Sequence, residues 1–189
     1  MTLASVVPTG LVAGTWSIET SHSEVSFTVK HLGLFKVRGS FTAFQGEITV
    51  ADGIEASTVE VEVDMTSVDT RDANRDTHLK SADFFDTDKY PAMNFRSTGL
   101  RFENGGAVLV GELTIRDTTR PLELAVEAAG VLQDPMGMTR TGFSARGELT
   151  RSDYGITFNM PLGDSGVMLS DKVQIQLDIQ AVLKADAAS

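Results

Sequence analysis

Apolar and polar residues alternate along most of the chain with a period of two. The pattern is clearest in 24–30, where Val25, Phe27 and Val29 occupy every second position, and it recurs in 58–65 and 173–180. Such alternation is typical of a strand with one face on a core and the other in water. Weaker alternation extends the set of predicted strands to 37–50, 93–102, 108–115, 122–131 and 140–149. The pattern therefore predicts about eight strands.

Turn residues separate these strands. Asp52-Gly53, Asn104-Gly105-Gly106 and Asp134-Pro135 all stand between alternating runs, and Asn-Gly-Gly is a strong hairpin signal. No pattern of a 10–15-residue helix stands between consecutive strands, which excludes a parallel, doubly wound sheet. The chain is predicted to be one all-β domain, either a sandwich or a closed antiparallel barrel.

Two segments break the alternation. Residues 70–90 are mostly polar, and Asp72 or Asp76 could cap a short helix that ends before Tyr90-Pro91. Residues 152–171 are rich in glycine and apolar residues and are long for a plain connection. Long loops of this kind are often lids or mouths, so we expect an irregular lid loop here.

Composition narrows the function. In 189 residues, 26 acidic side chains face 16 Lys and Arg, for a net charge of −10, which should repel phosphate backbones and anionic lipid head groups and argues against nucleic acid as a partner. The absence of cysteine excludes disulfides, thiolate catalysis and Cys-based metal sites. No run of 18 apolar residues occurs, so we expect a protein that does not span a membrane.

Residues 1–14 carry no Lys or Arg, and Pro8 and Gly10 interrupt their apolar positions. A secretory signal needs a basic start and an uninterrupted apolar run. We therefore expect residues 1–14 to be a flexible arm on a barrel that occupies residues 15–185. The expected location is the cytoplasm, or the periplasm or exterior if a signal has been removed.

Catalytic and metal-binding signals are weak. His22 and His31 stand at the two ends of one predicted strand, about 30 Å apart if it is straight, and no His-x-x-x-His pair includes them or His78. We expect hydrogen-bonding histidines and no metal site. Alternating acidic residues such as Glu60 and Glu62 are typical of a solvated strand face, so no catalytic residue is assigned.

The ten phenylalanines gather at strand ends and in the irregular segments, against two tyrosines and one tryptophan. They could fill a barrel core, or they could line a cavity for an elongated apolar ligand. Composition leaves both readings open, because cores and pockets are both apolar.

Several blocks resemble the YceI-like family. Trp16-Ser-Ile-Glu-Thr-Ser-His22-Ser23 precedes Val25-x-Phe27-x-Val29-x-His31-Leu32-Gly33, and Val37-x-Gly39-x-Phe41-x-x-Phe44-x-Gly46 follows. Later blocks are Ser67-Val68-x-Thr70, Arg75-Asp76-x-His78-Leu79, Asp83-Phe84-Phe85-Asp86, Tyr90-Pro91, Phe95-x-Ser97, Gly111-x-Leu113-Thr114-Ile115 and Arg151-Ser152-Asp153-Tyr154-Gly155-Ile156. One departure is Arg116-Asp117-Thr118-Thr119-Arg120-Pro121, where the family usually has Gly-Val-Thr-Lys-Pro. It affects only the local turn.

The resemblance implies an eight-stranded antiparallel lipocalin-like barrel that holds a long amphiphilic lipid, a polyisoprenoid quinone or a fatty-acid derivative. It also implies a homodimer. No cofactor is expected beyond the bound lipid. The mouth is expected between residues 75–85 and 152–169, with the polar head of the lipid beside it.

Candidate ligand-binding residues follow from the barrel interior and the mouth. Those expected to line it are Phe27, Val29, Phe41, Phe44, Val61, Phe95, Leu113 and Phe143 on strands, with Phe84, Phe85, Ile156 and Phe158 in the irregular segments. His31, His78 and Arg151 are candidates for the head group. For Arg75, Asp76 and Asp153 we favour a structural ion-pair set that pins the irregular loop.

Two other functions stay open at this level. A small hydrolase or isomerase could act on an apolar substrate in the same pocket, with His31, His78 or a buried carboxylate as its base. A filled barrel could instead act through its surface as a stress-response interaction module. Binding and carrying of a lipid without catalysis is the favoured hypothesis.

Overall fold

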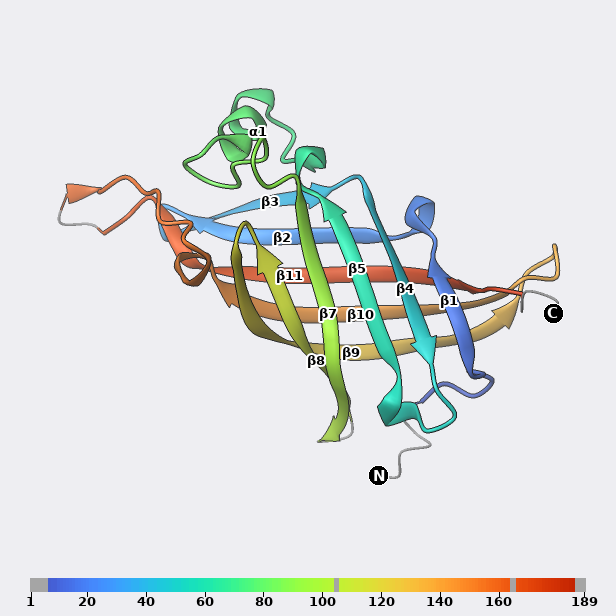
Figure 1. Ribbon diagram of the computed structural model, residues 1–189. Helices are drawn as coiled ribbons and strands as arrows, with labels where there is room; N and C mark the ends of the chain where they lie inside the picture. The colour runs from blue at the N-terminus through green and yellow to red at the C-terminus, as the bar shows by residue number, and fades with distance from the viewer. Residues whose placement is uncertain (1–6, 104–105, 164–165, 186–189) are drawn as a thin grey trace.

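The computed structural model describes residues 7–103, 106–163 and 166–185. Its strands are β1 (Gly14–Ile18), β2 (Glu24–His31), β3 (Phe35–Phe41), β4 (Phe44–Val50), β5 (Thr58–Asp64), β6 (Val68–Asp69), β7 (Ala92–Glu103), β8 (Gly106–Ile115), β9 (Thr118–Gln133), β10 (Thr139–Thr150) and β11 (Leu169–Leu183). The one α-helix of these ranges, α1 (Ala73–Lys80), lies above one end of the strands (Figure 1). Short 3-10 turns are η2 (Thr20–His22), η3 (Ile54–Ala56), η4 (Met65–Ser67) and η5 (Arg151–Tyr154).

Eight strands of the described chain close a ring in the order β1-β4-β5-β7-β8-β9-β10-β11. β1 closes it, because Trp16 pairs with Ile48 of β4 on one side and with Leu183 of β11 on the other. The pairings within the ring are antiparallel. The predicted all-β, eight-stranded, lipocalin-like barrel is confirmed.

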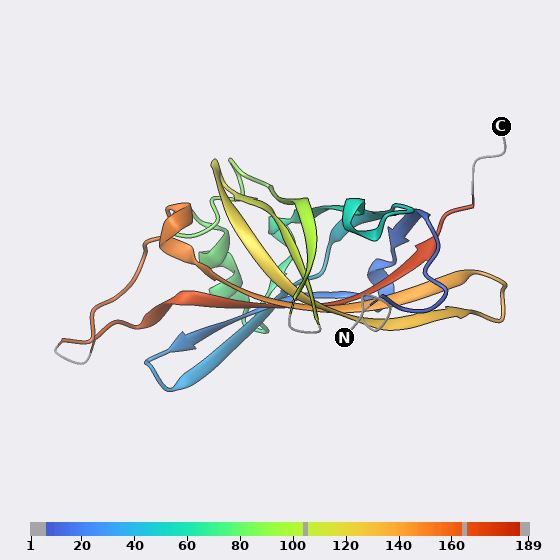
Figure 2. The ribbon, with the colours of Figure 1, turned by 90° about the horizontal axis from the view of Figure 1, so that it is seen from below.

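β11 pairs with β10 along one edge and is long enough to pair with two strands along the other. Its C-terminal part pairs with β1, while residues 169–178 pair with β2. β2 pairs in turn with β3, and β3 with the two-residue β6. The β2–β3 hairpin therefore projects beyond the ring at one end of the molecule (Figure 2).

Two details of the predicted strands are wrong. Residues 37–50 form two strands, since Thr42 N–H donates to the Ser67 carbonyl at 3.2 Å and Ala43 N–H to Ser67 Oγ at 3.0 Å, and these bonds replace the ladder. β1 and the two-residue β6 were not predicted, because strands this short do not show an alternation. The turn residues Asn104 and Gly105 lie outside the described residues, but Glu103 and Gly106 beside them pair as the hairpin prediction requires.

The predicted short helix is confirmed as α1. Asp72 caps it, because its carboxylate accepts hydrogen bonds from the Asn74 and Arg75 backbone N–H groups at 3.1 and 3.0 Å. These bonds hold the pKa of Asp72 below its ordinary value. Asp76, the other candidate cap, instead accepts from the backbone and hydroxyl of Thr70. The helix is thereby tied to the end of β6.

Apolar packing also stabilises the other end of the barrel, around β1. Trp16 and Ala181 are fully buried and pack with Val50 in a small cluster of their own. Trp16 Nε1 donates to the Val12 carbonyl at 3.2 Å, and Leu11 packs against the cluster. Of the segment 1–14 expected as a flexible arm, residues 1–6 lie outside the described residues, and the part from Val7 onward lies against the barrel.

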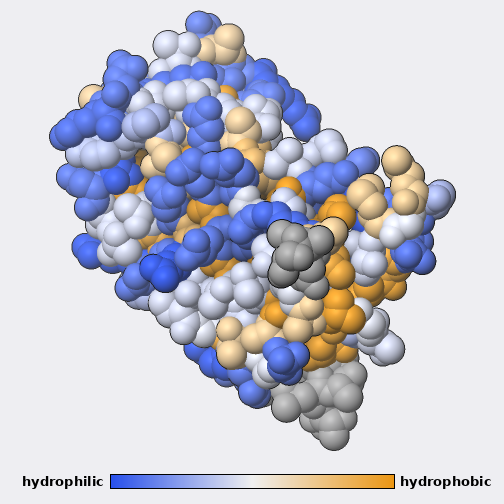
Figure 3. Space-filling view, turned by 45° about the vertical axis from the view of Figure 1, so that its right-hand side comes forward, coloured by the Kyte–Doolittle hydropathy of each residue, from blue (hydrophilic) through white to orange (hydrophobic). Residues whose placement is uncertain are grey.

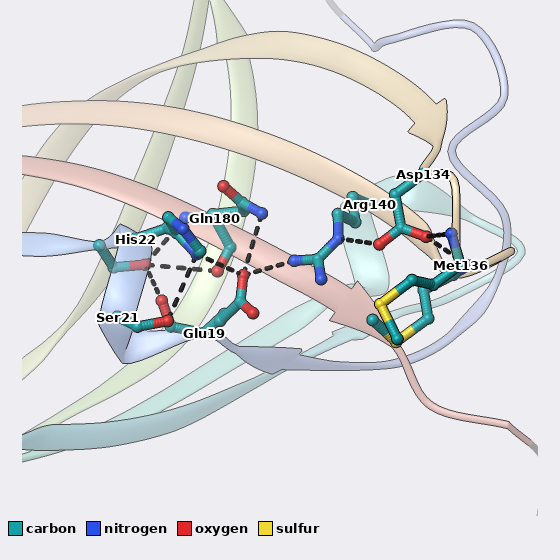
Figure 4. A network of polar contacts seen from close by, with 9 residues as sticks. Glu19, Ser21, His22, Asp134, Met136, Arg140 and Gln180 are labelled. Atoms are coloured by element: carbon teal, nitrogen blue, oxygen red, sulfur yellow. Dashed lines mark hydrogen bonds and ion pairs between the residues drawn. The ribbon is translucent and has the colours of Figure 1, made fainter.

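A polar network reinforces this end (Figure 4). Arg140 of β10 donates to Glu19 beside η2 and, through Nε, to Asp134 at 2.6 Å. Glu19 also accepts from Gln180 at 3.0 Å, and His22 Nδ1 lies 3.0 Å from it. The hydrogen bonds from Arg140 lower the pKa of both carboxyls. Side-chain hydrogen bonds thus join the end of β1 to β10 and β11 in addition to the backbone pairing.

Candidate ligand-binding cavity

The barrel is hollow. A cavity of about 550 Å³ lies inside it, within the range of roughly 300–1,000 Å³ typical of small-molecule sites. Packed interiors contain few voids larger than a water molecule, so a space of this size is no packing defect. Inward-facing side chains such as Phe27, Val61 and Phe95 are only half-buried although they lie inside the barrel. The cavity decides between the filled and hollow barrels, which composition left open.

The alternation of the strands builds the wall. Val25, Phe27 and Val29 of β2 face inward opposite Leu177, Ile175 and Val173 of β11. Because side chains of a strand alternate between its faces, the polar residues between them point outward. The lining is consequently almost wholly apolar along the whole barrel.

A glycine shapes one part of this wall. Gly39 of β3 pairs with Phe27, and a Cβ atom built on Gly39 would lie 2.4 Å from Cζ of the Phe27 ring. The missing side chain lets the ring lie flat against the strand. Phe27 then contacts Phe41, with ring centroids 5.7 Å apart. The width of the cavity here depends on a residue that sequence reasoning did not select.

At the α1 end, the lining becomes aromatic and polar. The His78 ring meets Phe84 and Phe158 edge-on, with centroids 5.0 and 4.9 Å apart. His78 Nε2 lies 2.8 Å from Asp83 Oδ2 on the solvent side. Arg75 donates to the hydroxyl and the carbonyl of Thr70, both at 2.7 Å. Polar groups and cavity meet at this end.

Arg151 holds the long irregular segment in place. Its guanidinium donates to the carbonyls of Ile156, Phe158 and Ser170 at 2.8–3.1 Å, and its side chain is buried. Burial lowers the pKa of Arg151, and the Asp171 carboxylate 4.0 Å away opposes that shift. In the residues that the structure describes, the hydrogen bonds of Arg151 all hold backbone carbonyl groups in place.

Asn159 closes the same segment into a hairpin-like extension. Its side-chain amide accepts from the Leu169 N–H at 2.9 Å and donates to the Leu169 carbonyl at 2.7 Å. Sequence reasoning missed Asn159. The signal that could have identified it is a single amide side chain in an otherwise apolar stretch. The expected lid loop is therefore a hydrogen-bonded extension at the cavity end, although its residues 164–165 lie outside the described residues.

The structural set expected from Arg75, Asp76 and Asp153 is only partly as predicted. Arg75 and Asp76 both bind Thr70, and in the ranges described no ion pair joins them to each other or to Asp153. Thr70 is the hub because its backbone and hydroxyl are buried between strand and helix. Hydrogen bonds to Thr70 therefore hold α1 against the end of β6, and the ion-pair prediction is wrong.

All the candidate residues named from the sequence line this cavity. They are Phe27, Val29, His31, Phe41, Phe44, Val61, His78, Phe84, Phe85, Phe95, Leu113, Phe143, Arg151, Ile156 and Phe158. That they contact a ligand stays a prediction. Sequence reasoning missed the far end of the lining, where Val7, Pro8, Leu11 and Ile54 contribute side chains from segments without strand alternation.

In the part of the chain that the structure describes, no cluster of three or more His, Asp or Glu side chains is arranged to hold a metal ion. Over the same residues, no helix has the length and apolarity needed to cross a membrane.

Comparison with known proteins agrees with the fold. A family model described as the YceI-like domain matches residues 16–181. A UPF0312 protein of Shewanella denitrificans is 35% identical over 168 residues, 87% of this chain and 88% of that protein. Protein YceI of Escherichia coli O17:K52:H18 is 38% identical over 139 residues, 73% of each chain.

Solved structures share the architecture. The Campylobacter jejuni YceI protein superposes with a TM-score of 0.68 at 28% identity, covering 82% of this chain and 90% of that one. BcnA of Burkholderia cenocepacia gives 0.72 at 21% identity, over 86% and 98% of the two chains. A polyisoprenoid binding domain from Saccharophagus degradans gives 0.68 at 12% identity, over 92% and 100%. The homodimer and the cytoplasmic location stay predictions.

Proposed function

The chain belongs to the YceI-like family, and we propose that it binds and carries one long amphiphilic lipid, a polyisoprenoid quinone or a fatty-acid derivative, without catalysis. The observation that carries the proposal is the apolar cavity that runs inside the barrel from the Leu11 end to α1. An apolar chain gains about 25 cal/mol for each Å² that it removes from water in such a cavity. A ligand can therefore bind tightly through its tail alone.

The polar residues at the α1 end support an amphiphile over a plain hydrocarbon. Arg75 and His78 on α1 and His31 at the end of β2 line this end of an otherwise apolar space. A tail in the barrel would leave the head group beside these side chains. The S. degradans domain, which shares the fold, is described as polyisoprenoid-binding, in agreement with a long apolar tail.

A hydrolase or isomerase in the same cavity is the weaker reading. A nucleophile activated by histidine needs its hydroxyl within hydrogen-bond reach of the ring. In the described residues, the hydrogen bond of the His78 ring goes to Asp83, and no Ser or Thr hydroxyl bonds to it. Turnover of p-nitrophenyl esters that is lost in His78→Ala would contradict the non-catalytic assignment.

Blocking the cavity tests the proposal. Val61 faces inward on β5 and Glu62, the next residue, faces water. Val61→Trp places a large ring in the cavity, whereas Glu62→Trp places the same ring outside. Delipidated protein is incubated with a polyprenyl benzoquinone or palmitate, gel-filtered and extracted. We expect stoichiometric uptake in wild type and Glu62→Trp, and at least a tenfold loss in Val61→Trp.

The position of the mouth needs its own variants. Phe85→Asp and Phe158→Asp place a charge at the α1 end and should abolish retention while circular dichroism shows a folded barrel. Undiminished uptake in both would contradict the mouth. Equal uptake by Val61→Trp and Glu62→Trp would contradict binding inside the barrel.

A further inference from the structure

The tip of the β2–β3 hairpin exposes large apolar side chains to water. Leu34 and Phe35 are 82% and 61% exposed, and Leu32 lies beside them. The Leu32 N–H donates to the Met168 carbonyl at 2.8 Å, which places the hairpin against the 156–168 segment. That segment adds exposed Met160, and both project from the same end of the molecule (Figure 2). We call residues Leu32, Leu34, Phe35 and Met160 the apolar tip.

The first central position of this hairpin turn is not occupied by a residue that its backbone favours. Leu32 and Gly33 have φ angles of +54° and +69°, and the Leu34 N–H closes the turn on the His31 carbonyl at 3.2 Å. Consecutive positive φ angles favour Asn or Gly, and a bulky residue there is strained. Leucine at position 32 is unfavourable for the turn, which points to a use for its exposed side chain.

Positive charge lies on the two strands that carry the apolar tip. Lys30, Lys36 and Arg38 lie on the outer face of the hairpin, whereas no Asp or Glu stands between Glu24 and Glu47 in this acidic chain. Lys30 pairs directly with Lys36 across the strands, an arrangement that is unfavourable in water. Among the described residues, none of the ion pairs includes these three cations. The hairpin is a basic region on a protein of net charge −10.

The apolar tip adjoins the cavity. His31 at the base of the turn, Val37 of β3 and Met160 all line it. A surface that covers the tip would therefore lie at the end of the barrel that carries the polar lining.

The opposite β9–β10 hairpin offers a matched contrast. Its Met136 and Leu132 are 83% and 61% exposed, nearly the same as Leu34 and Phe35. Its charges, however, are compensated: Arg140 lies between Asp134 and Glu19 (Figure 4). Apolar exposure alone is thus common to both hairpins, and unpaired basic charge distinguishes one.

We propose that the apolar tip and its three cations dock the protein on an anionic lipid bilayer, so that the amphiphile passes between bilayer and cavity at this end. The inference rests on the proposed lipid-binding function for its consequence, but the docking itself needs no ligand. Exposed apolar side chains enter the acyl boundary, and cations beside them are attracted to anionic head groups. A second copy of this chain fits less well, because a symmetric contact through the same tip would bring the Lys30, Lys36 and Arg38 cations of both copies together.

Vesicle flotation tests the docking. Wild-type protein is mixed with phosphatidylcholine vesicles containing none or 30% phosphatidylglycerol (about one lipid in three, enough for a negative surface). We expect binding to the anionic vesicles, weakened by salt. The double variant Leu34→Ser/Phe35→Ser should lose at least tenfold in partitioning, and Lys30→Gln/Lys36→Gln about fivefold for each charge removed. Leu132→Ser/Met136→Ser, the matched control, should bind like wild type.

Three results would overturn the docking. They are equal binding to neutral and anionic vesicles, an equal loss in the control variant, and self-association in sedimentation velocity that only Leu34→Ser/Phe35→Ser abolishes. Uptake of palmitate from vesicle-free solution separates the two proposals. A tip variant that takes up palmitate but does not float leaves the cavity proposal intact, whereas floating protein that takes up no palmitate contradicts the cavity proposal alone.

Discussion

The two ends of the barrel are built differently. At the β1 end, Trp16 and Ala181 are fully buried, and the carboxylates of Glu19 and Asp134 bind Arg140. At the α1 end, Phe158 is only half-buried, and aromatic and basic side chains face an open cavity. The β1 end is held by a buried tryptophan and paired charges, whereas the α1 end combines buried side chains such as Phe84 with the polar part of the cavity lining.

This difference shows where stability and function lie. Regions with dense packing and paired charges open last, whereas binding regions are drawn from the less stable part of a structure. We therefore expect substitutions at the β1 end to affect mainly unfolding, and those at the α1 end to affect mainly ligand binding. The following predictions test that division, from the largest effect to the smallest.

Trp16→Ala should cause the largest loss of stability. Removal of a fully buried tryptophan lowers the free energy of unfolding by about 3–5 kcal/mol. Here the lost side chain also belongs to β1, the strand that closes the ring. Phe158→Ala should cost only roughly 1–2 kcal/mol, because part of its ring is already exposed. Urea unfolding followed by circular dichroism measures both. Equal losses would contradict the division between the ends.

Ligand removal should act mainly on the α1 end. A ligand present at 100 times its dissociation constant stabilises the folded state by about 2.7 kcal/mol, so delipidation should lower the melting temperature. Hydrogen exchange should then rise more in α1 and residues 151–163 than in β1. A uniform rise, or a rise confined to β1, would speak against the placement of the ligand.

Gly39→Ala should narrow the cavity without breaking the fold. The new methyl group pushes the Phe27 ring inward, and we expect about a tenfold weaker affinity for a polyprenyl benzoquinone, equivalent to about 1.4 kcal/mol. Gly53→Ala is the control, since a Cβ there meets open space. Titration calorimetry compares the two. If both bind like wild type, the ligand does not occupy the cavity beside Phe27.

Acid should have the smallest effect, a loss of the stability that the charge network at the β1 end provides. Arg140 lowers the pKa of Glu19 and Asp134 from ordinary values of 4.5 and 3.8. A lowered carboxyl pKa adds stability that is complete above the ordinary value and is lost as the pH falls toward the folded-state pKa. The advantage of wild type over Arg140→Gln in urea should be full at pH 6 and shrink below about pH 4.5. A stability difference between wild type and Arg140→Gln that grows as the pH falls would contradict a stabilising role for these lowered pKa values.

The fold could be predicted from the sequence further than the site. Alternation found β2, β5 and β11 because each has one wet face, and the polar run around Asp72 identified α1. β1 was missed because five residues are too few to show a period. The bend at Thr42-Ala43 was missed because its cause, Ser67, is distant in sequence.

The hollow interior could not be predicted. The same valines and phenylalanines would fill a barrel or line one, and only their half-exposed positions in space separate the two cases. Asn159 and the contribution of Leu11 depend on contacts across the chain that leave no local pattern. The candidate ligand-binding residues named from the sequence nevertheless all line the cavity.

Native mass spectrometry of the purified protein, followed by solvent extraction and lipid identification, tests the central claim most directly. The account predicts one adduct per chain, released by solvent and carrying a prenyl or acyl tail. A protein that arrives empty and afterwards takes up neither a polyprenyl benzoquinone nor palmitate would contradict it.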